Sequence, residues 1–255
     1  MQTSRDNPSV NETLIILSLV ALLSSALSGL VGLGGGTILI AALFAAGLTP
    51  LEAVPLFAAV QLVSNSTRTV AYVRHVDWRA VAWFCVTVIP ATFVVAPFAA
   101  SVDVDAVRLV LAGLILASLL PGRGGEAPLP RRPSFLLAGL LNGGLGMFVG
   151  ATGLFVGRLF LRPEWRKETT IATLAVTQVL GHGLRIVAWG LVGASAFAQP
   201  RLLLAMCAAV IAGTWIGKSL NGRLSAGQFT GLFKVILVVL STKLIFDSLR
   251  GFGWI

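Results

Sequence analysis

The sequence is poor in charged residues and in the side chains that most enzymes use for catalysis. Only 11% of its 255 residues are charged, whereas a soluble domain has about 25%. It has two histidines, His75 and His182, and two cysteines, Cys85 and Cys207, both within apolar segments. Two isolated thiols form no metal motif, and the few acidic residues fall at segment ends or in loops. The sequence therefore predicts neither an enzyme nor a bound cofactor.

Long hydrophilic stretches are also absent, and apolar segments fill most of the chain. Hydrophobic residues make up 56% of the sequence, and the mean hydropathy is +0.90. The net charge of +9 could suggest a nucleic-acid partner, but the basic residues fall in short loops between apolar segments, where the positive-inside rule puts them. We therefore predict an all-α integral membrane protein whose partners are the lipid bilayer and a small substrate, with no nucleic acid.

The apolar run over residues 14–48 is too long for a single membrane helix. Its 35 residues would span about 52 Å at ~1.5 Å per residue, against a hydrocarbon core of about 30 Å. Three consecutive glycines before Thr37 mark the break, because glycine admits backbone conformations closed to other residues. We predict a half-helix that ends near Gly32 and a second that starts near Thr37, whose unpaired N–H groups and positive dipole end suit an anion. Close helix packing through Gly32 and Gly36 is the alternative.

The order of segments restarts after a central linker. Residues 121–133, rich in proline, glycine and arginine, divide the chain almost at its middle. We predict an N-terminal tail over residues 1–13, a first membrane repeat over 14–120 and a second over 134–255. The second repeat also begins with a glycine-broken run, at residues 134–161. The remaining helices are predicted at residues 50–73, 78–99, 106–120, 169–191, 201–220 and 226–249.

A shift of 117 residues aligns the two repeats with each other. The shift puts Gln61 over Gln178 and glycines of the two broken runs over each other. It also puts Arg68 over Arg185. The matched order across both halves predicts two homologous repeats, each with one glycine-broken helix or hairpin plus three transmembrane helices.

The loop charges predict that the two repeats are inverted relative to each other. If each broken run is a hairpin or a pair of crossings, most loop arginines and lysines fall on one side of the membrane. If each broken run crosses once, the same residues divide almost evenly. The positive-inside rule favours the first arrangement, with the central linker in the cytoplasm and both termini outside. In that arrangement the outer side holds Arg5, Arg108, Arg201 and Arg250.

Two arginines at matched positions lie deep in apolar segments. Each costs roughly 2.5–3.5 kcal/mol to insert at a bilayer centre, so we expect Arg68 and Arg185 to face a wet or paired interior. A glutamine and an Asn or His precede each arginine by seven and three residues, which puts all three on one helix face. Without a carboxylate at similar depth, the two guanidinium groups and two half-helix N-termini predict a positive cavity for an oxyanion. The predicted substrate-binding residues are Gly34, Gly35, Gly36, Gln61, Asn65, Arg68, Thr152, Gly153, Gln178, His182 and Arg185.

Several of these residues also have a structural interpretation, which the sequence leaves open. Arg68 and Arg185 could extend to the nearer membrane interface, since both approach the end of their segments. His182 could be a hydrogen-bonded structural residue rather than a proton carrier. Gln61 and Gln178 could simply join neighbouring helices through hydrogen bonds.

Three motifs of the first repeat occur together in one family of membrane proteins. The motifs are Gly32-Leu33-Gly34-Gly35-Gly36 after an apolar helix, the Thr-Pro-Leu-Glu-Ala-Val start of the next helix, and Ser64-Asn65-Ser66 before an Arg-rich loop. Together they resemble the TauE/SafE-type sulfite exporter family. The resemblance implies a multi-pass secondary transporter of the bacterial inner membrane that carries sulfite, sulfoacetate or other organosulfonates. The glycine turn, Asn65 and their second-half counterparts would then line the path.

The second repeat departs from the family pattern, and other functions stay open. Gly150-Ala151-Thr152-Gly153 stands where the family often repeats a glycine-rich turn, so the substrate does not follow from the resemblance. A membrane channel is one alternative to a transporter that works by alternating access. A structural or assembly partner of another membrane complex is a second, but it leaves the two matched arginines unexplained. A homo-oligomer, the direction of transport and the coupling ion are likewise undecided.

Overall fold

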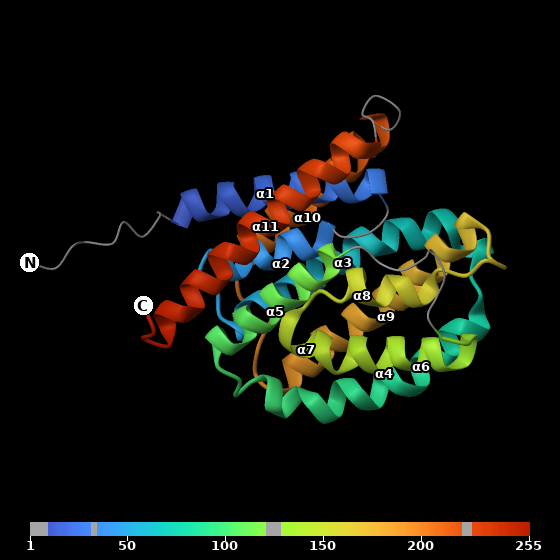
Figure 1. Cartoon of the computed structure of the whole chain (residues 1–255), viewed down its shortest axis with the longest axis horizontal. Coiled ribbons are helices and arrows are strands. Elements are labelled where there is room, and N and C mark those ends of the chain that lie inside the picture. Colours follow the sequence, from blue (N-terminus) through green and yellow to red (C-terminus); the bar gives the residue numbers. More distant parts are fainter. Residues whose placement is uncertain (1–9, 32–34, 121–128, 221–225) are drawn as a thin grey trace, which may run out of the picture.

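In the computed structural model, all regular secondary structure of the described residues, 10–31, 35–120, 129–220 and 226–255, is helical. The all-α fold class is therefore confirmed, and helix bounds lie within a few residues of the predicted ones. The largest shift is at α1, which begins at Val10 inside the predicted N-terminal tail, and α6 begins inside the predicted linker. The elements are α1 (Val10–Val31), α2 (Gly35–Ala45), α3 (Pro50–Tyr72), η1 (Val73–His75), α4 (Trp78–Ala99), α5 (Val104–Leu119), α6 (Arg131–Gly143), α7 (Leu145–Val149), α8 (Gly153–Val156), η2 (Gly157–Phe160), α9 (Lys167–Leu191), α10 (Pro200–Leu220) and α11 (Ala226–Gly251) (Figure 1).

Three helices in the described residues are long and apolar enough to cross a membrane. They are Trp78–Ala99, Lys167–Leu191 and Pro200–Gly217, and shorter apolar helices lie at Asn11–Leu27 and Gly35–Ala45. The apolar window of α9 is 61% buried, against 28% for α4 and 33% for α10. Helix α9 is therefore the central membrane helix, and α4 and α10 lie at the periphery.

The second apolar run is interrupted, as predicted. In the first run α1 ends at Val31 and α2 begins at Gly35, two residues before the predicted start, and residues 32–34 between them lie outside the described residues. In the second run α6 ends at Gly143, and two short helices follow. The left-handed φ of +73° at Gly150 separates these two helices, and glycine adopts it without steric cost.

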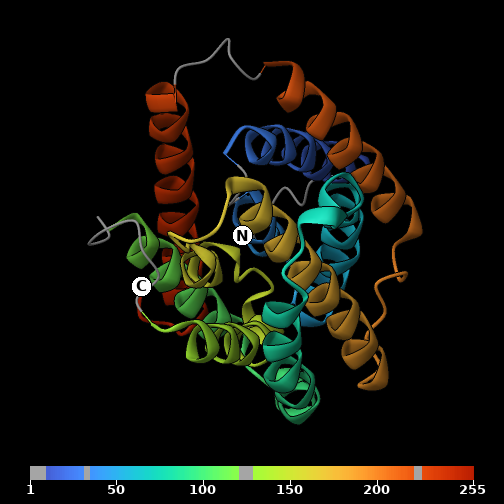
Figure 2. The same cartoon turned by 90° about the vertical axis from the view of Figure 1, so that its right-hand side faces the viewer.

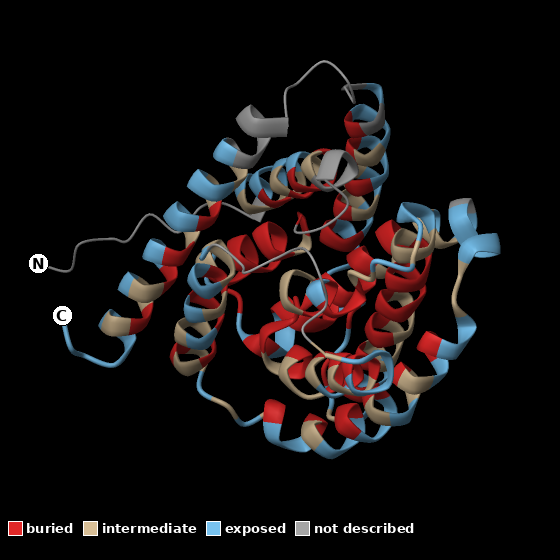
Figure 3. Ribbon diagram, turned by 45° about the vertical axis from the view of Figure 1, so that its right-hand side comes forward, coloured by how far each residue is buried: buried red, intermediate tan, exposed pale blue. Residues whose placement is uncertain are grey.

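The helices of the two halves pack in reciprocal pairs. Helix α1 packs along α10, and α6 packs along α4 (Figure 2). Helices α4 and α10 have matching positions in the two halves, so the first helix of each half lies against the same helix of the other half. The matched helices α3 and α9 pack against each other, as do α5 and α11. Buried residues face the middle of this assembly and exposed residues face outward (Figure 3).

Glycine pairs bring the α4–α6 and α1–α10 helices into close backbone contact. Gly139 and Gly143 lie on α6, and Gly213 and Gly217 lie on α10. A Cβ atom at any of the four would lie 2.2–2.6 Å from a carbonyl oxygen of the partner helix. Small residues at this spacing are typical of membrane helix pairs, because they let the backbones approach.

Hydrogen bonds run beside the glycine pairs. The hydroxyl of Thr87 on α4 donates to the carbonyl of Leu136 at 2.7 Å, and Ser25 on α1 donates to that of Val210 at 2.8 Å. Each of the two helix pairs is thus held by backbone contact and by a hydroxyl-to-carbonyl bond.

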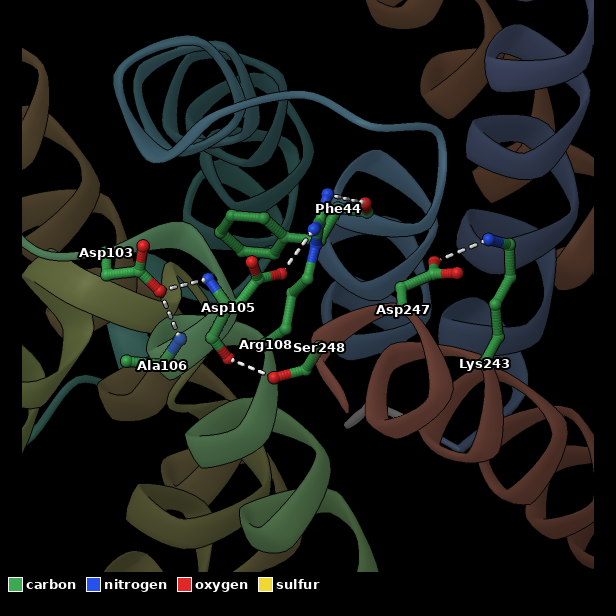
Figure 4. A network of polar contacts seen from close by, with 8 residues as sticks. All are labelled: Phe44, Asp103, Asp105, Ala106, Arg108, Lys243, Asp247 and Ser248. Carbon is green, nitrogen blue, oxygen red and sulfur yellow. Dashed lines mark hydrogen bonds and ion pairs between the residues drawn. The ribbon is translucent and has the colours of Figure 1, made fainter. Parts of the chain in front are cut away.

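The acidic residues of α5 support the helix bundle away from the arginines of α3 and α9. Asp103 caps α5 by accepting from the N–H groups of Asp105 and Ala106 (Figure 4). Arg108 forms an ion pair with Asp105 at 2.7 Å, and the hydroxyl of Ser248 on α11 donates to the carbonyl of Asp105 at 2.7 Å. This network joins α5 to α11. The buried carboxylate of Asp105, at the start of α5, is paired with Arg108.

Candidate functional site

The centre of the molecule holds a fully buried arginine. The side chain of Arg185 on α9 is 1% exposed. Its Nη2 donates to the backbone carbonyl of Asn142 at 3.0 Å and lies 3.4 Å from the Oδ1 atom of the same residue. Its Nη1 donates to Nδ1 of His182 at 2.9 Å. The guanidinium group is therefore fixed between α9 and the end of α6.

The bond from Arg185 decides the protonation of His182. A guanidinium group can only donate, so Nδ1 of His182 must accept and carry no proton. The neutral ring then keeps its hydrogen on Nε2. The ring meets Phe57 of α3 edge-on, with 5.5 Å between ring centroids. His182 thus connects Arg185 to the central helix of the first half.

Asn142 links the second broken run to α9. Its Nδ2 donates to Oγ1 of Thr152 at 3.0 Å and to Oε1 of Gln178 at 3.5 Å. All three side chains are buried. Because Asn142 also accepts from Arg185, its amide orders both the turn after α7 and the polar face of α9.

Two glycines make room for these polar groups. A Cβ atom at Gly146 would lie 2.2 Å from Nη2 of Arg185. A Cβ atom at Gly181 would lie 2.1 Å from Oδ1 of Asn142. Any side chain at either position would therefore displace the guanidinium group or the amide.

Several donors on α9 are buried but unpaired within the described part of the chain. They are Nε of Arg185, Nε2 of Gln178 and Nε1 of Trp189. Spacings of seven and four residues put the three side chains on one face of the helix. No carboxylate among the described residues pairs with Arg185. A buried positive charge beside unpaired donors matches the chemistry of an anion.

In the first half, the start of α2 meets α3. A Cβ atom at Gly36 would lie 3.1 Å from Nε2 of Gln61 and 3.3 Å from Cζ of Phe57. Gly35 is buried and Gln61 is buried. Gly34 lies outside the described residues. The structure therefore brings together the glycine turn and the glutamine that the sequence singles out.

Phe57 lies between the two broken runs. Besides Gly36 and His182, it faces Gly150, where a Cβ atom would lie 3.2 Å from Cδ1 of Phe57. The ring is fully buried. One aromatic side chain thus contacts Gly36 of the first half and both Gly150 and His182 of the second.

The matched arginines have different surroundings. Nη2 of Arg68 lies 3.5 Å from Oγ of Ser64 on its own helix, and the side chain is only half-buried. Nearby, Nδ2 of the buried Asn65 donates to the carbonyl of Gln61 at 2.9 Å. Arg185, by contrast, is 1% exposed and bonds to Asn142 on α6. The two matched arginines therefore differ in their exposure to solvent.

The second half-helix expected after the glycine turn is short. Helix α8 has four residues, Gly153–Val156, before the 3₁₀ turn Gly157–Phe160. It is too short to carry the dipole of a half-helix. A Cβ atom at Gly153 would meet no atom of the described chain within 4 Å, whereas the adjacent Thr152 is buried and bonded to Asn142. In the second half, side chains replace the helix end as the source of positive potential.

Sequence reasoning missed four residues of this site. Asn142 had a readable signal, an amide inside an apolar run followed by two glycines. Gly146 and Gly181 had none, because their role depends on which side chain lies opposite. Phe57 reads as an ordinary core residue, and only the packing of α3 on α9 puts it beside His182.

The comparisons with known proteins agree with the resemblance seen in the motifs. The family model described as sulfite exporter TauE/SafE matches residues 17–244, nearly the whole chain. No curated protein and no solved structure gives a significant match. The match covers α1 through most of α11, so it includes both broken runs and the Arg185 cluster.

Proposed function

Because the chain belongs to the sulfite exporter TauE/SafE family of membrane transporters, we propose that it is a secondary transporter of sulfite or a related organosulfonate in the bacterial inner membrane. The observation that carries this proposal is the buried Arg185 guanidinium, which has unpaired donors beside it and no carboxylate partner among the described residues. A guanidinium group and nearby N–H donors match the oxygens of a tetrahedral or pyramidal sulfur oxyanion.

The substrate anion replaces the missing counter-charge. Its oxygens accept from Nε of Arg185 and from Nε2 of Gln178, which are both buried and unpaired among the described residues and belong to side chains that both contact Asn142. Asn142 and His182 hold the guanidinium group in position before the anion arrives, so little ordering is needed on binding.

Transport follows from movement of the two halves around this site. The reciprocal helix pairs support two equivalent halves, since each pairing recurs when the halves are exchanged, and the loop charges favour their inversion. Phe57 lies between Gly36 of the first broken run and Gly150 of the second, and its ring meets His182. Rocking along the α3–α9 contact exposes the Arg185 cluster to one side of the membrane and then to the other.

Uptake of sulfite or a sulfonate by proteoliposomes tests the proposal. We expect saturable transport by the wild type and a loss of at least a hundredfold in Arg185→Gln, because the anion then lacks its counter-charge. Arg201→Gln, which removes an exposed arginine at the start of α10, is the matched control and should transport normally. Normal transport by Arg185→Gln would overturn the site, and flux that never saturates would indicate a channel.

A further inference from the structure

A second basic site lies where α4 and α6 begin, and it shares no residue with the Arg185 cluster. A cavity of about 260 Å³ opens between the two helices. Its lining residues are Arg79, Ala80, Trp83, Arg131, Arg132 and Phe135. Three guanidinium groups and two aromatic rings therefore surround one small volume.

The positive charge of this cavity is only partly balanced. Arg131 forms an ion pair with Asp77, and its Nε lies 3.8 Å from Glu164. Arg79 and Arg132 are exposed, and neither pairs with a carboxylate among residues that the structure describes. Two arginines thus leave an uncompensated charge of about +2 at the cavity.

Aromatic rings hold two of the three arginines, Arg131 and Arg132, in place. The guanidinium carbon of Arg132 lies 4.3 Å from the centre of the Trp83 ring, which is a close cation–π contact. Phe135 is buried and stacks on Trp165 at 5.5 Å, so it forms a rigid apolar wall. The charges of these two arginines are therefore held against aromatic rings, while Arg79 contributes its charge from an exposed position.

The position along α4 puts the cavity at the level of lipid headgroups. Helix α4 is one of the three helices long and apolar enough to cross a membrane, and it begins at Trp78, which is 60% exposed. Arg79 and Trp83 lie in its first two turns. Exposed tryptophan beside arginine at the end of a membrane helix is typical of the interface between hydrocarbon and water.

We propose that this cavity binds the phosphate of an anionic phospholipid headgroup. Guanidinium groups bind phosphate oxygens through paired N–H donors, and basic pockets between membrane helices suit such headgroups. The lipid's acyl chains lie along the exposed apolar face of α4, which includes Val86, Phe93 and Val94. Because α4 and α6 come from different halves of the chain, one lipid contacts both.

Native mass spectrometry of the purified full chain in detergent tests this proposal. The probes are phosphatidylglycerol and, as a zwitterionic comparison, phosphatidylcholine. We expect Arg79→Gln/Arg132→Gln to bind phosphatidylglycerol about thirtyfold more weakly than the wild type, since two basic contacts are lost. Arg74→Gln/Arg201→Gln loses the same charge from exposed positions outside the cavity and should keep wild-type affinity.

Three results would overturn the proposal. The first is an equal loss of affinity in both double variants, which would mean that only the overall charge matters. The second is equal binding of phosphatidylcholine and phosphatidylglycerol. The third is displacement of the lipid by millimolar inorganic phosphate or sulfite, which would make the cavity a site for free anions. None of these results bears on transport at Arg185, because binding is read without a substrate gradient.

Discussion

A buried guanidinium group without a carboxylate is the costliest feature of the Arg185 site. Its neighbours in the structure, the carbonyl of Asn142 and Nδ1 of His182, are neutral acceptors. Such acceptors satisfy hydrogen bonds but leave the charge itself uncompensated. In the proposed function, a ligand anion supplies this compensation. The affinity of the site for an anion therefore depends on the absence of a negative side chain as much as on the arginine.

Asn142→Asp should separate the stability of the site from its affinity for anions. The new carboxylate would take the place of Oδ1, which lies 3.4 Å from Nη2 of Arg185, and would compensate the charge internally. We expect the thermal unfolding midpoint to hold or rise, while sulfite binding weakens about ten- to a hundredfold. Calorimetric titration and thermal unfolding in detergent measure the two effects.

Asn142→Ala is the matched comparison at the same position. It removes the amide without adding charge, so we expect a loss of about 1–3 kcal/mol in stability with a smaller change in anion affinity. If the aspartate variant bound sulfite as tightly as the wild type, the anion would not be held by the charge of Arg185.

At the residue scale the sequence predicted identities better than partners. Gln178, His182 and Arg185 could be selected because polar groups seven and three residues apart share a helix face. Their partners could not, since Asn142 and Gly146 reach them from another element. The alignment of Arg68 with Arg185 suggested equal burial, but Arg185 is 1% exposed and Arg68 is only half-buried.

At the scale of elements, glycine spacing sets how closely the helices pack. Gly139 and Gly143 on α6 let its backbone touch α4, and Gly213 and Gly217 do the same for α10 on α1. Hydrophobic burial contributes little between helices in lipid, so backbone approach and hydroxyl bonds such as that of Thr87 become the main attractions.

Gly139→Ala should therefore destabilise the α4–α6 pair. The added methyl group would lie 2.3 Å from the carbonyl oxygen of Phe84, and separating the helices would cost about 1–3 kcal/mol. Gly113→Ala on α5 is the control, because a Cβ atom there meets no atom within 4 Å and the change favours the helix by up to ~1 kcal/mol. Thermal unfolding that showed the same gain for both variants would mean that α4 and α6 do not pack closely.

Helix starts could be predicted more closely than the interior of the broken runs. Thr49 and Glu52 form the expected cap, in which the carboxylate accepts from the backbone N–H of Thr49 at 2.9 Å. The run after α6 instead divides into α7, α8 and a 3₁₀ turn. Glycines mark where such a run can break, but the packing around it decides where each piece ends.

At the scale of the whole molecule, the reciprocal helix pairs and the loop charges support the same arrangement. Exchange of the halves turns the α1–α10 pair into the α6–α4 pair and leaves α3–α9 unchanged. Packing alone cannot give the direction of each half across a bilayer. The arginines and lysines can, because they favour the cytoplasmic side. The charge count therefore favours inverted halves, a question that the helix pairs leave undecided.

Labelling of single cysteines in intact cells tests this topology, in a chain whose Cys85 and Cys207 have been replaced by serine. If each broken run returns to its starting side, His75→Cys and Glu164→Cys both lie in the cytoplasm. Both should then react with a membrane-impermeant maleimide only after the cells are permeabilised. Ser101→Cys and Ala198→Cys, in the exposed turns after α4 and α9, should react without permeabilisation. If each broken run instead crosses once, residues 75 and 164 lie on opposite sides, and only one of the two should be protected. That result would leave the halves parallel and remove the basis for rocking around Arg185, because the alternating exposure of a central site depends on inverted repeats.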